Sequence, residues 1–198
     1  MRIRNSSAIH PIQAGASIIL FLSLLPELLA MAMISQRPHL LFVYGTLKRG
    51  YYNHNVYLRL AEVNGAAKYL GNATTREKFA LKILGERCVP ALMEEPPDFF
   101  VHGEVYCISD DVLEAMDLLE GVAEGHYFRR QRTVQMQTNK MESLNSNEET
   151  CWVYMQTPKL KNTLTQNGPS YNSYTKDLHE TYVPPTTGPD PSILKLLQ

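Results

Sequence analysis

From residue 39 onward, the chain is a succession of short apolar runs that stop at glycine or proline. The first run, His39 to Tyr44, is rich in β-favouring residues and ends at Gly45, so it predicts a buried strand that opens the domain and leads into a loop. Further short strands are expected between Ala66 and Met93, separated by Gly71, Gly85 and Pro90. Longer strands are expected over Phe99–Ile108, Tyr127–Gln137 and Cys151–Gln156, and Gly103 suggests a bulge in the first of these.

Two helices are expected between these strands. Residues Tyr51 to Val63 carry apolar side chains at roughly helical spacing. The second helix begins after Ser109, a typical N-cap, and ends at Gly121. Its apolar stripe consists of Val112, Leu113, Met116 and Leu119.

Composition excludes several classes of protein. With 198 residues, of which 44% are apolar, the chain can bury one core, and one domain with extensions is expected. A net charge of -1 provides no overall field for polyanions, so no nucleic-acid partner is expected. Neither C-x-x-C nor H-x-x-x-H occurs, so we expect no metal, and the three cysteines are expected to be thiols in a reducing compartment (Cys88, Cys107 and Cys151).

The first 37 residues have a distinct character. The apolar run Ala16 to Leu25 is too short to span a membrane, so no membrane-spanning segment is expected. Together with Arg2, Arg4 and the triplet at residues 30–32, it fits a secretory signal. The alternative is an upstream extension with a later start at Met31 or Met33, and we expect a cytoplasmic protein unless residues 1–32 act as a signal.

The sequence divides into three parts. Residues 1–37 form the apolar leader, residues 38–157 the folded domain and residues 158–198 a polar tail. Prolines, asparagines and threonines dominate the tail, which predicts a loosely packed arm that its tyrosines could anchor.

One carboxylate stands out in the second helix. Glu120 lies four residues after Met116 and seven after Leu113, so it shares their apolar face. Burial and the C-terminal end of the helix dipole would both raise its pKa, as suits a general base. The alternative is that Glu120 turns out to solvent beside Gly121.

The loop from Gly45 to Gly50 could bind a phosphate, bind an oxyanion or carboxylate through backbone amides, or be an ordinary turn. Tyr51 and Tyr52 stand where a nucleotide-binding loop needs lysine and a hydroxyl residue, which disfavours the first option. Lys48 and Arg49 could add a minor positive potential for an anionic substrate.

Taken together, these features resemble the γ-glutamylcyclotransferase superfamily, and most closely its γ-glutamylamine cyclotransferase (AIG2-like) branch. The resemblance covers roughly Leu41 to Tyr154. It is carried by Val43 to Gly50 with Asn53-His54, by Gly103-Glu104-Val105-Tyr106, by Asp117-Leu118-Leu119-Glu120 and by Tyr127 through Val134.

The resemblance implies an α+β fold, a small mixed β-barrel with flanking helices. It also implies that Glu120 is the catalytic acid/base and that the substrate-binding loop consists of Tyr44, Gly45, Thr46 and Leu47. The substrate of that branch is γ-glutamyl-ε-lysine, left when transglutaminase crosslinks are proteolysed, and the products are 5-oxoproline and a free amine.

Such a reaction needs no metal or cofactor, because the substrate contains its own nucleophile. We also expect a monomeric enzyme with a small-molecule γ-glutamyl substrate. Two alternatives remain open. The enzyme could act on γ-glutamyl α-amino acids, or the barrel could be a noncatalytic binding module.

Overall fold

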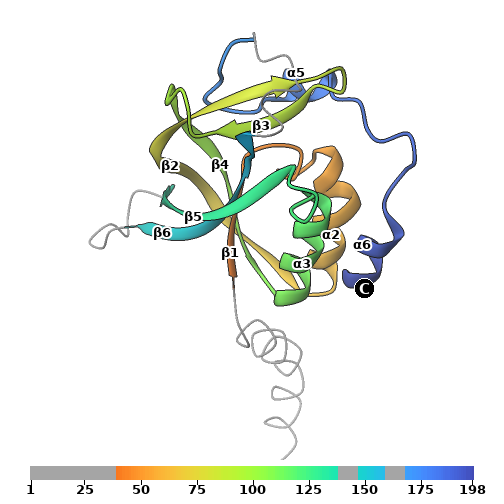
Figure 1. Cartoon of the computed structure of the whole chain (residues 1–198). Coiled ribbons are helices and arrows are strands. Elements are labelled where there is room, and N and C mark those ends of the chain that lie inside the picture. The colour runs from red at the N-terminus through yellow and green to blue at the C-terminus, as the bar shows by residue number, and fades with distance from the viewer. Residues whose placement is uncertain (1–38, 138–146, 159–167) are drawn as a thin grey trace, which may run out of the picture.

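A computed structural model describes residues 39–137, 147–158 and 168–198, so the expected leader lies outside the described residues (Figure 1). The elements follow one another as β1 (His39–Val43), the π-helix η1 (His54–Leu58), α2 (Arg59–Val63), β2 (Ala67–Leu84), β3 (Val89–Met93), β4 (Phe99–Ile108), α3 (Asp110–Leu119), β5 (Tyr127–Met136), β6 (Glu148–Gln156), α5 (Lys176–Glu180) and α6 (Pro191–Leu196).

Five of the strands close into a barrel. Their order is β2-β4-β1-β6-β5, and β5 pairs back with β2, while β3 pairs with residues 80–84 of β2. Strands β1 and β6 run parallel, whereas the other recorded pairings are antiparallel. This is the small mixed barrel with flanking helices that the resemblance implied, and α2 and α3 lie on the same side of it (Figure 1).

Two of the expected strand breaks are wrong. Gly71 lies inside the long strand β2, where its φ of +151° accompanies a shift in register between Tyr69 and Gly71. The chain therefore bends at this glycine without leaving the sheet. Pro90 lies inside β3, an edge strand, where the missing N–H does not interrupt the barrel.

Gly103 is not the site of a bulge, because the recorded register shifts of β4 lie elsewhere. A Cβ at this position would clash with the carbonyl oxygen of Val43 and would lie 2.5 Å from Cζ of Phe42. Glycine therefore allows β4 and β1 to approach each other closely.

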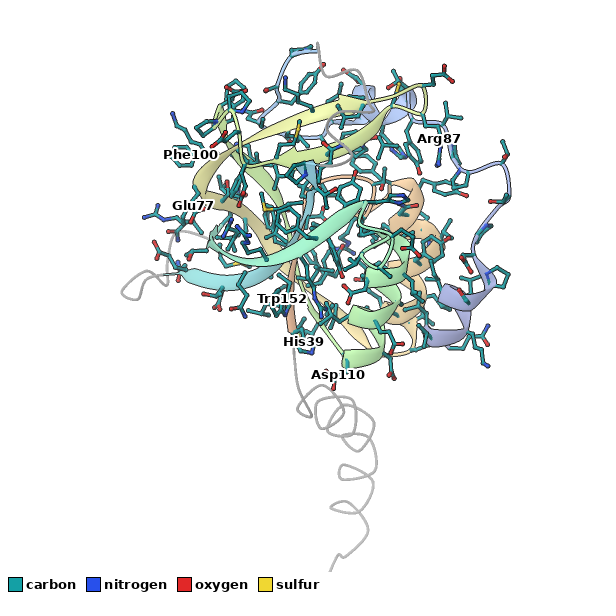
Figure 2. All side chains as sticks on the ribbon, in the orientation of Figure 1. His39, Glu77, Arg87, Phe100, Asp110 and Trp152 are labelled. Carbon is teal, nitrogen blue, oxygen red and sulfur yellow. The ribbon has the colours of Figure 1, made fainter. Side chains whose placement is uncertain are left out.

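The helix α3 begins as the sequence predicts, whereas the helix expected over Tyr51–Val63 consists of η1 and α2. The Ser109 side chain accepts a hydrogen bond from the Val112 amide and caps α3. At the N-terminal end of α3, Asp110 Oδ1 lies 2.6 Å from His39 Nε2 at the start of β1. Figure 2 labels both residues. Within the described ranges, no helix combines the length and the apolar character that a membrane crossing requires.

The core has two clusters because neighbouring strand residues face opposite ways. Leu41 packs with residues of the helices, such as Leu58 and Met116. Phe42 belongs to the second cluster, made mainly of inward-facing strand residues such as Val105 and Val153.

The C-terminal segment, residues 168–198, packs more closely than its composition predicts. Tyr174 is fully buried, and Tyr171 forms a bridge with Leu81 of β2. Ile193 and Leu197, in and after α6, are also buried, and α6 packs on α3. A few apolar side chains are thus enough to hold a polar segment on the barrel.

Candidate active site

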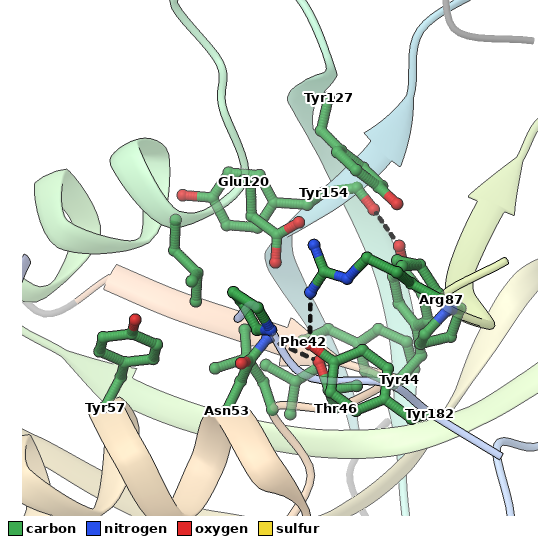
Figure 3. Close-up of a pocket in the computed structure, with 17 residues that line it drawn as sticks. Phe42, Tyr44, Thr46, Asn53, Tyr57, Arg87, Glu120, Tyr127, Tyr154 and Tyr182 are labelled. Carbon is green, nitrogen blue, oxygen red and sulfur yellow. Dashed lines mark hydrogen bonds between the residues drawn. The ribbon is translucent and has the colours of Figure 1, made fainter. Parts of the chain in front are cut away.

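A cavity of about 190 Å³ opens between the loop after β1, the end of α3, the turn between β2 and β3, and the C-terminal segment (Figure 3). The residues expected to form the site all line this cavity: Tyr44, Gly45, Thr46, Leu47 and Glu120. The barrel thus brings together two parts of the sequence that are more than 70 residues apart.

The loop after β1 is held by its own hydrogen bonds. The Lys48 amide donates to the Gly45 carbonyl at 3.0 Å, and the His54 amide donates to the Thr46 carbonyl at 3.1 Å. Asn53 Nδ2 also donates to Thr46 Oγ1 at 2.8 Å. In the described part of the chain, no backbone carbonyl accepts a hydrogen bond from the amides of Gly45, Thr46 or Leu47. These amides are therefore available to a ligand.

Gly45 is required by close packing. A Cβ here would lie 2.7 Å from Cγ of Pro90, which lines the same cavity from β3. The glycine therefore lets the loop lie against β3 at the wall of the cavity.

The Tyr44 hydroxyl stabilises the sheet by bonding to two strands. Its hydroxyl donates to the Tyr154 carbonyl at 2.9 Å and accepts from the Leu92 amide at 3.3 Å. Burial raises the pKa of this phenol well above its ordinary value, so it stays neutral. What Tyr44 offers a ligand is its ring and backbone.

Glu120 follows α3 directly. Its amide donates to the Met116 carbonyl at 3.0 Å, and Gly121, with φ of +61°, turns the chain away. Figure 3 shows the Glu120 carboxyl directed into the cavity. No hydrogen bond to this carboxyl is recorded among the described residues, and burial raises its pKa to about 7. A carboxyl of this kind can accept and return a proton near neutral pH.

Tyrosines surround this acid, and of these only Tyr44 was expected in the site from the sequence. For Tyr44, Tyr127 and Tyr154, burial raises the pKa and the negative charge of Glu120 adds to the effect. Tyr182, from the C-terminal segment, also lines the cavity. Neutral phenols around one carboxyl keep the site poorly hydrated, consistent with the raised pKa of Glu120.

The expected cations do not line the cavity. Lys48 Nζ donates to the Tyr174 carbonyl at 2.9 Å, and burial lowers the pKa of this amine. The Arg49 guanidinium lies over the ring of Tyr69, 4.6 Å from its centroid. The positive charge in the lining comes from Arg87 instead, and no local motif around this residue could have indicated that.

The cysteines and the possible metal ligands are less suited to catalysis than Glu120. The three cysteines are free thiols, and burial raises the pKa of Cys151 to about 12. Across residues 39–137, 147–158 and 168–198, no group of three or more histidine, cysteine or acidic side chains could hold a metal ion.

Comparison with known proteins identifies the family of this chain. A family model described as gamma-glutamyl cyclotransferase, AIG2-like, matches residues 41–176. The chain is 36% identical over 141 residues to gamma-glutamylaminecyclotransferase B of Danio rerio, covering 68% of this chain and 67% of that protein. It is 42% identical over 82 residues to gamma-glutamylaminecyclotransferase of Rattus norvegicus, covering 41% of this chain and 54% of that protein.

A solved structure gives the same result. The crystal structure of an AIG2-like protein from Mus musculus superposes with a TM-score of 0.61 at 30% sequence identity, covering 76% of this chain and 99% of that one. Sequence and fold agree on one assignment, and the chain belongs to the AIG2-like gamma-glutamyl cyclotransferase family of enzymes.

Proposed function

We propose that this protein is a γ-glutamylamine cyclotransferase that converts γ-glutamyl-ε-lysine to 5-oxoproline and lysine. One observation carries the proposal: the Glu120 carboxyl, with its raised pKa, shares a cavity with the free amides after β1. The names of the rat and zebrafish relatives support the γ-glutamylamine substrate.

In the proposed reaction, the substrate supplies its own nucleophile. Ionised Glu120 accepts a proton from the substrate α-ammonium group, and the freed nitrogen attacks the γ-carbonyl carbon. The new C–N bond closes a five-membered ring. The bond to the amine then breaks as Glu120 returns its proton to the departing nitrogen. The ring nitrogen also loses its second proton, which the released amine takes up to become an ammonium ion. No water, oxidant or reductant is consumed.

The loop supplies stabilisation of charge. As the ring closes, negative charge develops on the carbonyl oxygen, and amides from Gly45 to Leu47 can donate to it. The cavity of about 190 Å³ is smaller than the roughly 300–1,000 Å³ of sites that enclose drug-sized ligands. It therefore suits the γ-glutamyl group alone, held in a folded geometry.

The cysteines support the expected compartment of the enzyme. The free thiols of Cys107 and Cys151 favour a cytoplasmic, reducing compartment.

The test is 5-oxoproline release from γ-glutamyl-ε-lysine by the parent protein and by Glu120→Gln. We expect a loss of at least about 100-fold in the variant, since it lacks the acid/base group. Glu124→Gln removes an exposed carboxylate four residues later and serves as the matched control. An active Glu120→Gln protein would overturn the assignment of Glu120.

A panel of γ-glutamyl compounds separates the alternatives. Turnover of γ-glutamyl α-amino acids in preference to γ-glutamyl-ε-lysine would make the protein a γ-glutamylcyclotransferase of that other substrate class. Binding of these compounds without any cyclised product would identify a noncatalytic module.

A further inference from the structure

Arg87 lies at the open end of the cavity, on the turn that joins β2 to β3. The Cys88 amide closes this turn by donating to the Gly85 carbonyl at 3.1 Å. Arg87 is exposed, whereas Tyr44 and Leu47 on the loop are buried, so the arginine marks the side of the cavity that opens to solvent. Figure 3 shows its guanidinium extending over the cavity from the wall opposite the α3 helix.

The charges of the cavity are few. Of the 17 residues that line it, Glu120 is the acid and Arg87 is the base, and the remainder are uncharged. Among the described residues, no ion pair joins Arg87 to Glu120. The guanidinium is therefore not neutralised by the catalytic carboxyl.

The C-terminal segment fixes the direction of this arginine. Arg87 Nε donates to the Val183 carbonyl at 3.0 Å, and the Val183 amide donates back to the Arg87 carbonyl at 3.0 Å. One Nη donates weakly to the Tyr182 hydroxyl at 3.5 Å. A guanidinium carries five N–H donors, so the group is held in place while several donors remain for a ligand.

The proposed reaction determines which part of a substrate reaches this donor. The γ-carbonyl must lie between Glu120 and the loop amides, at the closed end. The small cavity leaves no room there for the amine portion, which must extend outward past Arg87. A planar guanidinium at that point matches a carboxylate better than any other common group.

We propose that Arg87 is a specificity-determining residue, which binds a carboxylate carried by the amine that the enzyme releases. This inference rests on the proposed function and narrows it: the preferred substrates are γ-glutamyl derivatives of amino acids, lysine among them, rather than of simple amines. Arg87 acts on binding of the leaving amine and takes no part in proton transfer.

The test compares γ-glutamyl-ε-lysine with γ-glutamyl-ε-lysinamide, in which a neutral carboxamide replaces the lysine carboxylate. The parent protein should favour the carboxylate by about tenfold or more in kcat/KM, as expected for a charge-assisted hydrogen bond. Arg87→Gln should reduce this preference to about twofold or less, mainly through KM. The same comparison with γ-glutamyl-alanine and γ-glutamyl-alaninamide covers a carboxylate nearer to the scissile bond.

Arg59→Gln, which removes an exposed arginine outside the cavity, is the control and should keep the parent preference. If Arg87 only anchors the C-terminal segment, its replacement will slow both members of a pair alike and the preference will survive. That result, or a parent protein that does not distinguish the pairs, would overturn the role of Arg87. Absence of any 5-oxoproline from the parent would instead overturn the proposed function.

Discussion

The Tyr154 hydroxyl donates a hydrogen bond of 2.6 Å to Asp117 Oδ1, three residues before Glu120. Asp117 also pairs with Arg129 Nη1 of β5 at 3.2 Å. The last turn of α3 is thus tied to two strands of the barrel, because Tyr154 belongs to β6. These contacts set the position from which Glu120 faces the cavity.

Tyr154→Phe should therefore lower both stability and activity. The hydroxyl bond to a carboxylate is lost, which should reduce the free energy of unfolding by about 1–3 kcal/mol in urea titrations. We expect kcat to fall more than KM rises, since the acid is displaced while the loop amides stay in place. Tyr69→Phe, which removes a hydroxyl bond to Asn72 outside the cavity, is the control. Unchanged kcat would contradict the positioning role.

The pH dependence of stability should reveal the burial of Glu120. Its pKa is raised from 4.5 to about 7, so the folded protein holds this proton more tightly than the unfolded chain. Ionising it in the fold is unfavourable, and the free energy of unfolding should fall as pH rises from about 4.5 to about 7. Glu120→Gln lacks this titratable carboxyl. The melting temperature of the variant minus that of the parent should therefore rise across that pH window and level off above it. An equal difference at all pH values would contradict the burial of this carboxyl.

The same pKa should govern the rate. Ionised Glu120 is the proposed base, so kcat/KM should fall about tenfold for each pH unit below about 7. The measurement is initial 5-oxoproline release between pH 5 and pH 9 in buffers of constant ionic strength. A flat profile through neutral pH would argue against a single carboxyl as the base.

Local spacing was sufficient to predict some parts of this molecule. Glu120 could be assigned to the apolar face of α3 because helical periodicity relates it to Leu113 and Met116, and Ser109 and Gly121 define the ends of that helix. The loop from Gly45 was recognisable because it directly follows a strand. Both inferences depend on neighbours in the sequence.

Other parts depend on contacts between distant segments. Arg87 reaches the cavity because β2 and β3 pair and because Val183 holds its side chain, and neither relationship has a local signature. Gly71 looks like a strand break, but the pairing of β2 with β4 carries the chain through it. Burial of Ile193 likewise depends on α3, which a polar tail does not predict.

Gly45→Ala should disturb the loop by overpacking. The added methyl would meet Pro90 Cγ at 2.7 Å, and relieving this clash should cost about 1–3 kcal/mol in the free energy of unfolding. The loop amides would move with it, so KM should rise and kcat should fall. Gly168→Ala is a suitable control, because nothing lies within 4 Å of a Cβ at that position. Parent-like stability and kinetics would show that β3 can yield at Pro90.

Glu104 should hold the far end of the same loop. It is only 8% exposed, and its Oε2 accepts hydrogen bonds from the Arg49 amide at 2.9 Å and the Tyr106 hydroxyl at 3.0 Å. Glu104→Ala leaves both donors without this partner, which should lower the free energy of unfolding by about 2–4 kcal/mol. Tyr106→Phe removes one donor and keeps the carboxylate on the Arg49 amide.

The kinetic comparison of these two variants separates a loop function from a stability effect. If Glu104 positions the loop through the Arg49 amide, Glu104→Ala should raise KM for γ-glutamyl-ε-lysine about tenfold, because the binding amides lose their fixed direction. Tyr106→Phe should destabilise the protein with a KM within about twofold of the parent value. Equal KM values for the two variants would mean that the carboxylate supports the core and not the loop.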